Sequence, residues 1–77
     1  MMAVRLIEGL HLTAFDKRAL VSCHAGGFTG WHTARKRYTL ARDGDAWRYV
    51  IRWRESDMFG RVIDRQSAGR VTFTGAA

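Results

Sequence analysis

The chain has 77 residues, of which 47% are hydrophobic, and its 13 Lys and Arg against 7 Asp and Glu give a net charge of +6. This length predicts one compact domain over residues 1–77, and the hydrophobic content argues against a disordered tail. The start lacks a signal-peptide pattern, no apolar run approaches the ~18 residues of a membrane span, and the single Cys23 excludes an intrachain disulfide. We therefore expect a soluble, cytoplasmic protein. A domain this small buries only about 60% of its unfolded surface, so we expect modest stability unless the protein oligomerises. The sequence is compatible with both a monomer and a homodimer.

The N-terminal quarter predicts a strand followed by a helix. Apolar residues alternate from Val4 to Leu12, which indicates a strand bent at Gly9. Thr13 and Asp16 form a variant of the helix-capping pattern, in which Thr13 caps the helix and Asp16 lies in its first turn. The spacing of the apolar residues that follow predicts a helix over residues 14–25, stopped by a glycine pair.

Residues 34–54 predict a β-hairpin with Asp43 and Gly44 at its tip, because Asp-Gly between two alternating segments is typical of a type I′ turn. A four-residue tip over residues 42–45 keeps the same alternation, whereas a three-residue loop with a bulge would scatter the aromatic residues over both faces. One face is then the core candidate, with the pairs Leu40–Trp47, Tyr38–Tyr49, Lys36–Ile51 and Ala34–Trp53. The other face holds the pairs Thr39–Arg48, Arg37–Val50, Arg35–Arg52 and Thr33–Arg54.

Five arginines share this second face, and they are the candidate partner-binding residues: Arg35, Arg37, Arg48, Arg52 and Arg54. Like charges directly opposite on a sheet are mildly unfavourable, so Arg35 facing Arg52 is not explained by stability. The face is either a solvated, charged surface that discourages aggregation or a surface that meets an acidic partner or a nucleic-acid backbone. We favour the second interpretation.

The C-terminal third is less clearly patterned. Residues Met58 to Asp64 fit either a strand or a helix, and we favour a strand because a glycine and a β-branched pair weaken a helix. Residues 66–69 predict a loop, 70–74 the last strand and 75–77 a loose end. The predicted fold is α+β, with an antiparallel β-sheet of four to five strands and one helix packed on one face, in the order β-α-β-β-β-β. The helix should cover the large side chains of the hairpin's second strand, Trp47, Tyr49, Ile51 and Trp53.

The sequence argues against catalysis, metal binding and cofactor binding. Cys23 and His24 are adjacent and point about 100° apart on a helix, so they are poor partners for each other. One cysteine with three scattered histidines matches no zinc-ligand spacing, and Cys23 lies on the apolar stripe of its helix. The acidic residues fall in caps and turns rather than in acid–base pairs. We expect no enzyme, no metal and no cofactor.

Two functions remain. The first is a protein-binding module whose arginine face docks on an acidic protein surface or nucleoprotein complex and occludes it. The second is direct nucleic-acid binding, which the sorting of aromatics away from the arginines disfavours. In size, in its single cysteine and in its lack of catalytic motifs, the chain resembles the small anti-defence proteins of phages and mobile elements, those of the anti-CRISPR type among them. That resemblance implies an inhibitor that acts in a bacterial host cytoplasm and blocks target-DNA binding by a CRISPR effector complex.

Overall fold

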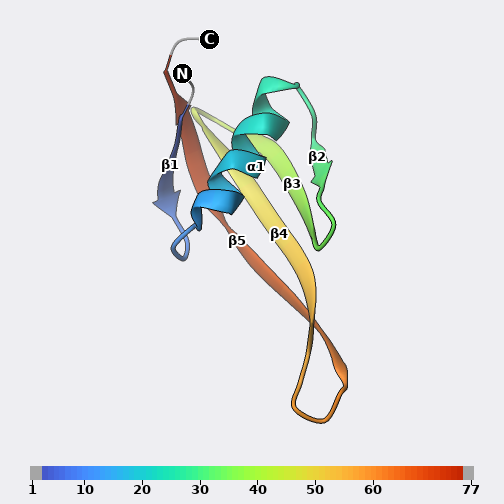
Figure 1. Cartoon of the computed structure of the whole chain (residues 1–77). Coiled ribbons are helices and arrows are strands. Elements are labelled where there is room, and N and C mark those ends of the chain that lie inside the picture. Colours follow the sequence, from blue (N-terminus) through green and yellow to red (C-terminus); the bar gives the residue numbers. More distant parts are fainter. Residues whose placement is uncertain (1–2, 76–77) are drawn as a thin grey trace.

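The computed structural model describes residues 3–75 and shows one helix and one antiparallel sheet (Figure 1). The chain order is β-α-β-β-β-β, so the predicted α+β class is confirmed. The elements are β1 (Ala3–Glu8), α1 (Ala14–Ala25), β2 (Gly30–His32), β3 (Lys36–Asp43), β4 (Ala46–Ser56) and β5 (Val62–Thr74).

The five strands lie in the order β1-β5-β4-β3-β2, and α1 packs across one face of this sheet (Figure 1). The opposite face has no covering layer among residues 3–75. Strands β4 and β5 are much longer than their neighbours and continue beyond the rest of the molecule as a two-stranded arm. The overall dimensions are therefore elongated, 47 × 22 × 19 Å.

The core lies between α1 and the sheet. Tyr49 and Ile51 of β4 are buried there, as predicted, whereas Trp47 and Trp53 are half-buried and pack against its margin. A single 12-residue helix is too short to cover the full length of β4, which explains the difference. The buried core consists of Leu12, Ala19, Leu20, Cys23, Tyr38, Leu40, Tyr49, Ile51 and Val71.

The helix begins where the sequence predicts. The Thr13 side chain accepts a hydrogen bond from the Asp16 backbone N–H at 3.1 Å, which satisfies one of the free donors of the first turn. The sequence did not predict that the Asp16 side chain is buried against β3. Its Oδ1 accepts hydrogen bonds from the Tyr38 hydroxyl at 2.6 Å and from the Lys36 ammonium at 3.0 Å. This pair of contacts ties the start of α1 to the sheet.

The predicted register of the hairpin is wrong by two residues. Asp43 pairs with Ala46, which leaves Gly44 and Asp45 as a two-residue loop. Among the loop residues only Gly44 has a positive φ, of 62°, and glycine adopts it without steric cost. A type I′ turn at the predicted position would instead force a positive φ on Asp43. Because the shift is by two residues, each side chain of β3 and β4 keeps its predicted face.

The structure also corrects the C-terminal prediction. Residues 66–69, predicted as a loop, lie inside β5, which runs unbroken over 13 residues, and most of residues 58–64 form the preceding turn rather than a strand. Gly69 is not a turn residue: a Cβ there would collide with the Glu8 backbone oxygen, because the chain after β1 crosses closely over β5. The strand expected at residues 70–74 is the end of β5. Of the loose end expected at residues 75–77, only Gly75 lies within the described residues.

The N-terminal strand is shorter than predicted and β2 was not predicted. Strand β1 ends at Glu8, and Gly9 follows with a φ of 118°, so the predicted bend ends the strand. Leu12 is still buried, because the connecting segment leads directly into α1. The three-residue strand β2 pairs with β3 at the opposite edge of the sheet and places Trp31 beside Tyr38.

Candidate arginine-rich binding site

The alternation of β3 and β4 separates the aromatic side chains from the arginines. On the helix side, β4 places its buried Tyr49 and Ile51. On the other side, the helix-free face, the same strand presents Arg48, Arg52 and Arg54, and β3 presents Arg37. Four of the five candidate arginines therefore share one exposed face, although they lie on it in a different register from the one predicted.

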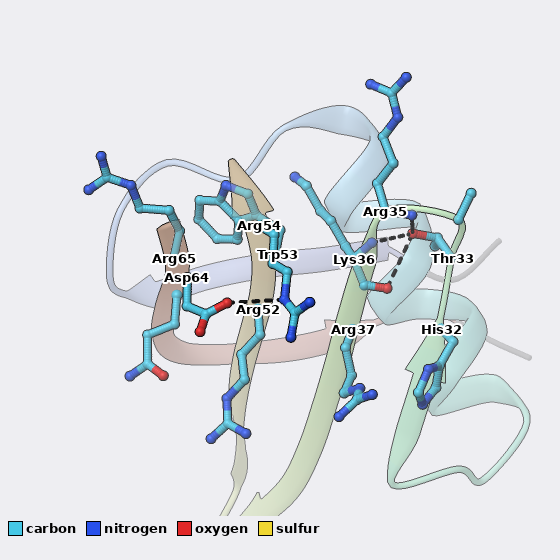
Figure 2. Close-up of a pocket in the computed structure, with 12 residues that line it drawn as sticks. His32, Thr33, Arg35, Lys36, Arg37, Arg52, Trp53, Arg54, Asp64 and Arg65 are labelled. Atoms are coloured by element: carbon cyan, nitrogen blue, oxygen red, sulfur yellow. Dashed lines mark hydrogen bonds and ion pairs between the residues drawn. The ribbon is translucent and has the colours of Figure 1, made fainter. Parts of the chain in front are cut away.

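Arg35 is the exception. It lies in the turn between β2 and β3, which the sequence had assigned to the hairpin's first strand, so it has no cross-strand partner. Figure 2 shows its side chain extending to the opposite side from Arg37 and Arg52. The structure therefore does not pair Arg35 with Arg52. Arg35 instead lines a hollow between the β2–β3 turn and the root of the β4–β5 arm, which Arg37 and Arg52 also line.

Arg37 and Arg52 lie directly opposite each other on neighbouring strands. Both are exposed, and neither forms an ion pair within residues 3–75. Their row continues to His32 on β2 and to Gln66 on β5, neither of which supplies a negative charge. The centre of the face thus holds two adjacent, uncompensated guanidinium groups, an arrangement that is unfavourable for the isolated fold.

Three other arginines of the face have acidic partners, whereas Arg5 of β1, which lies opposite Thr72, forms no ion pair within residues 3–75. Arg48 contacts Asp43 at 3.2 Å, and Arg54 contacts Asp64 at 3.2 Å. Sequence analysis missed Arg70, which lies opposite Arg48 because the loop predicted before it is part of β5. Arg70 contacts Glu8 at 2.7 Å and so is also compensated. The surplus charge that β3 and β4 place on this face is therefore concentrated at Arg37 and Arg52.

A large open hollow of about 1130 Å³ lies between the β2–β3 turn and the root of the β4–β5 arm (Figure 2). We call it the arginine groove. Its lining includes one carboxylate, that of Asp64, and six cationic side chains, Arg35, Lys36, Arg37, Arg52, Arg54 and Arg65. Guanidinium groups bind carboxylates and phosphates through paired hydrogen bonds, so the groove suits an anionic group of a larger partner.

The surface beside the groove bears small side chains. One row across the helix-free face consists of Gly30, Thr39, Val50 and Ala68. Among the described residues, the Trp, Tyr and Phe side chains of β2, β3, β4 and β5 all lie on the helix side, and the sheet presents on this face only the imidazole ring of His32. The face therefore offers close approach and positive charge, with one small ring on which a base could stack.

The remaining chemically reactive candidates lie elsewhere. Cys23 is fully buried, its thiol donates a hydrogen bond to the Phe28 backbone oxygen at 3.1 Å, and burial raises its pKa. Such a thiol is poorly suited to nucleophilic attack. Within residues 3–75, no group of three or more His, Cys, Asp or Glu side chains is arranged to hold a metal ion.

Comparison with known proteins adds no relative. No protein-family model matches the chain, and neither the curated proteins nor the solved structures give a significant match. In the described part of the chain, no helix is long and apolar enough to cross a membrane.

Proposed function

We propose that this protein is a non-catalytic binding protein that docks its helix-free face and arginine groove on an acidic macromolecular surface and occludes it. The supporting observation is the pair Arg37 and Arg52, which face each other across two strands and have no acidic partner in the described part of the chain. Two adjacent cations without a counter-charge cost folding free energy, and an acidic partner would remove that cost on binding.

The preferred partner is an acidic protein surface or the protein part of a nucleoprotein complex. Arginine is enriched in the energetic centres of protein interfaces, and the row Gly30, Thr39, Val50 and Ala68 allows a partner to approach the sheet closely. The ion pairs of Arg48 and Arg54 with their neighbours lower the surplus charge at the edges of the face. Such a compensated rim around an uncompensated centre favours a specific contact over general attraction to polyanions.

Direct nucleic-acid binding is the second candidate, and the composition of the arginine groove favours it. Six cationic residues and one carboxylate line the groove, and guanidinium groups bind phosphates as readily as carboxylates. Of the six, Lys36 and Arg65 lie on the helix side, where they pair with Asp16 and Glu55. In this case binding depends on the phosphate backbone more than on the bases, because within residues 3–75 the strands present only the His32 ring on this face. The affinity for mixed-sequence DNA would then fall steeply with added salt.

If the partner is a bacterial defence complex, the activity would be inhibition by occlusion, as in proteins of the anti-CRISPR type. This part of the proposal depends on the resemblance in size and general character, and the site adds to it only a surface capable of one-to-one docking.

The test is an affinity pull-down of tagged protein from bacterial lysate, with and without nuclease, for wild type and Arg37→Glu/Arg52→Glu. The matched control is Lys17→Glu/Arg18→Glu, which makes the same charge change on α1, away from the groove. A stoichiometric, nuclease-resistant protein that is lost only in Arg37→Glu/Arg52→Glu would support the preferred partner class.

Recovery of nucleic acid alone, with the same dependence on Arg37 and Arg52, would move the assignment to the second candidate. Equal loss in the control would mean that net charge, and not the arginine groove, governs binding. That outcome would refute the proposed site.

A further inference from the structure

The arm formed by the outer parts of β4 and β5 displays apolar side chains at its tip, far from the core (Figure 1). Met58 is 89% exposed and Phe59 is 75% exposed. Val62, at the start of β5, is 65% exposed. Three exposed apolar residues within five positions of one turn form a local patch, and such patches on small proteins mark contact surfaces.

The turn that carries this tip is held in one conformation by Asp57. Its carboxylate Oδ1 accepts hydrogen bonds from the backbone N–H groups of Phe59 and Arg61, both at 2.8 Å. Its Oδ2 contacts the Arg61 side chain at 2.9 Å, and its backbone N–H donates to the Arg61 oxygen at 2.9 Å. Met58 and Phe59 are thus presented to solvent by a pre-organised turn, which lowers the ordering cost of a contact made there.

The charges along the arm are compensated within the arm. Arg54 pairs with Asp64 at 3.2 Å, Arg65 with Glu55 at 3.3 Å and Arg61 with Asp57 at 2.9 Å. An arm that inserts into nucleic acid needs surplus positive charge to neutralise phosphates. Two such arms, by contrast, can lie side by side without strong repulsion. The occupant indicated by this charge pattern is a protein, and a second copy of the chain meets the requirement.

A second hollow, of about 490 Å³, lies on the helix side at the root of the same arm, between the start of α1 and the arm. Its apolar lining is Leu10 and Trp53, with Leu12 and Ile51 buried beneath them. The rest of its lining is polar and includes the charged residues Asp16, Lys36, Glu55 and Arg65. Leu10 is 75% exposed although it is a large apolar side chain. The Trp53 ring is fixed by a hydrogen bond from its Nε1 to Glu55 at 2.8 Å. The hollow therefore offers Leu10 and the fixed Trp53 ring as apolar surface, bordered by charged side chains.

We propose that the protein forms a two-fold symmetric dimer in which the arms are exchanged, so that Met58 and Phe59 of each copy enter the root hollow of the other. The five residues from Trp53 to Met58 span about 17 Å at the usual rise of a strand. A two-fold axis through the middle of the arm places each tip at the partner's root, because tip and root are equally far from the axis. Both contacts form together, so the assembly closes at two copies. This inference does not depend on the function proposed for the arginine groove.

The test measures the oligomeric state of the full chain by analytical ultracentrifugation across the micromolar range. Wild type is expected to shift from the 8.8 kDa monomer to twice that mass as its concentration rises. Met58→Ser/Phe59→Ser should weaken the dimer roughly tenfold or more, the loss expected for a central apolar anchor. The matched control is Phe28→Ser. Phe28 is an aromatic residue that is 53% exposed, and it follows the C-terminal end of α1, whereas the root hollow lies at the helix start.

A second measurement defines the contact. Chains with Leu10→Cys are mixed with chains with Phe59→Cys under mild oxidation, while Cys23 remains buried. A mixed disulfide between the two chains supports arm exchange. Wild type that stays monomeric throughout, a dimer unchanged by Met58→Ser/Phe59→Ser, or cross-linking of Phe59→Cys chains only to one another would each overturn the proposal.

Discussion

Replacing Arg37 with Thr should make the fold more stable, although it removes a residue of the proposed binding site. Arg37 faces Arg52 across two strands, and within residues 3–75 neither has an acidic partner. Directly opposed like charges typically cost about 0.2–1 kcal/mol, so a gain of about 0.5 kcal/mol is expected. For a chain of 77 residues this corresponds to a rise in melting temperature of about 3 °C.

The design must separate charge repulsion from the higher strand propensity of Thr. We would measure the free energy of unfolding in urea for Arg37→Thr, Arg52→Thr and the double variant. Both single changes remove the same repulsion, so the double variant should gain less than the sum of the two single gains. Propensity effects cancel in this comparison. The gain from each single change should also shrink in high salt, which screens exposed charges.

The matched control is Arg54→Thr. Arg54 lies on the same strand and face as Arg52, but it contacts Asp64 at 3.2 Å. Its removal loses a weak ion pair and should give no salt-sensitive gain. If Arg37→Thr and Arg52→Thr are destabilising or strictly additive, the two arginines do not repel each other in the folded state. The argument that this pair is maintained for binding would then fail.

Three further predictions concern the core. Tyr38→Phe removes the 2.6 Å hydrogen bond to the Asp16 carboxylate and should cost about 1.5–3 kcal/mol in chemical denaturation. Burial acts to raise the pKa of Asp16, but hydrogen bonds from Tyr38 and Lys36 outweigh it and hold this pKa below its ordinary value. The contribution of Asp16 to stability should therefore be complete above about pH 4 and decline as pH falls through the lowered pKa. In Tyr38→Phe this decline should begin at a higher pH. Gly69→Ala places a Cβ against the Glu8 backbone oxygen and should cost about 1–3 kcal/mol by overpacking, a result that an unchanged thermal melt would contradict. Cys23, whose pKa is raised by burial, should react with iodoacetamide only after unfolding, and rapid alkylation of the native protein would show that the thiol is accessible.

Local patterns in the sequence predicted several elements because their causes are local. The helix over residues 14–25 has its cap at Thr13, and the structure places both at the predicted residues. The two faces of β4 follow from a strict two-residue alternation, so Arg48 and Arg52 lie opposite the core whatever the register. A shift of two residues in the pairing with β3 did not alter this division.

The errors have long-range causes. Gly69 resembles a loop residue in the sequence, but its lack of a side chain is required by the backbone near Glu8, about sixty positions away in the chain. The same misassignment hid Arg70 from the candidate face. Arg35 was placed in a strand because the sequence does not show that β2 is a separate strand with its own turn before Lys36.

The fold class, the position of the helix and the separation of arginines from aromatics could be predicted from local patterns, because each depends on neighbouring residues or on the two-residue period of a strand. Which arginine faces which depends on the pairing of distant strands, so the sequence did not show that Arg48 and Arg54 have acidic partners while Arg37 and Arg52 have none within residues 3–75. Only the tertiary structure shows that β4 and β5 extend beyond their neighbours as an arm. Strand register and relative strand length depend on which distant segments pair, and that choice is made by packing of the whole sheet against α1.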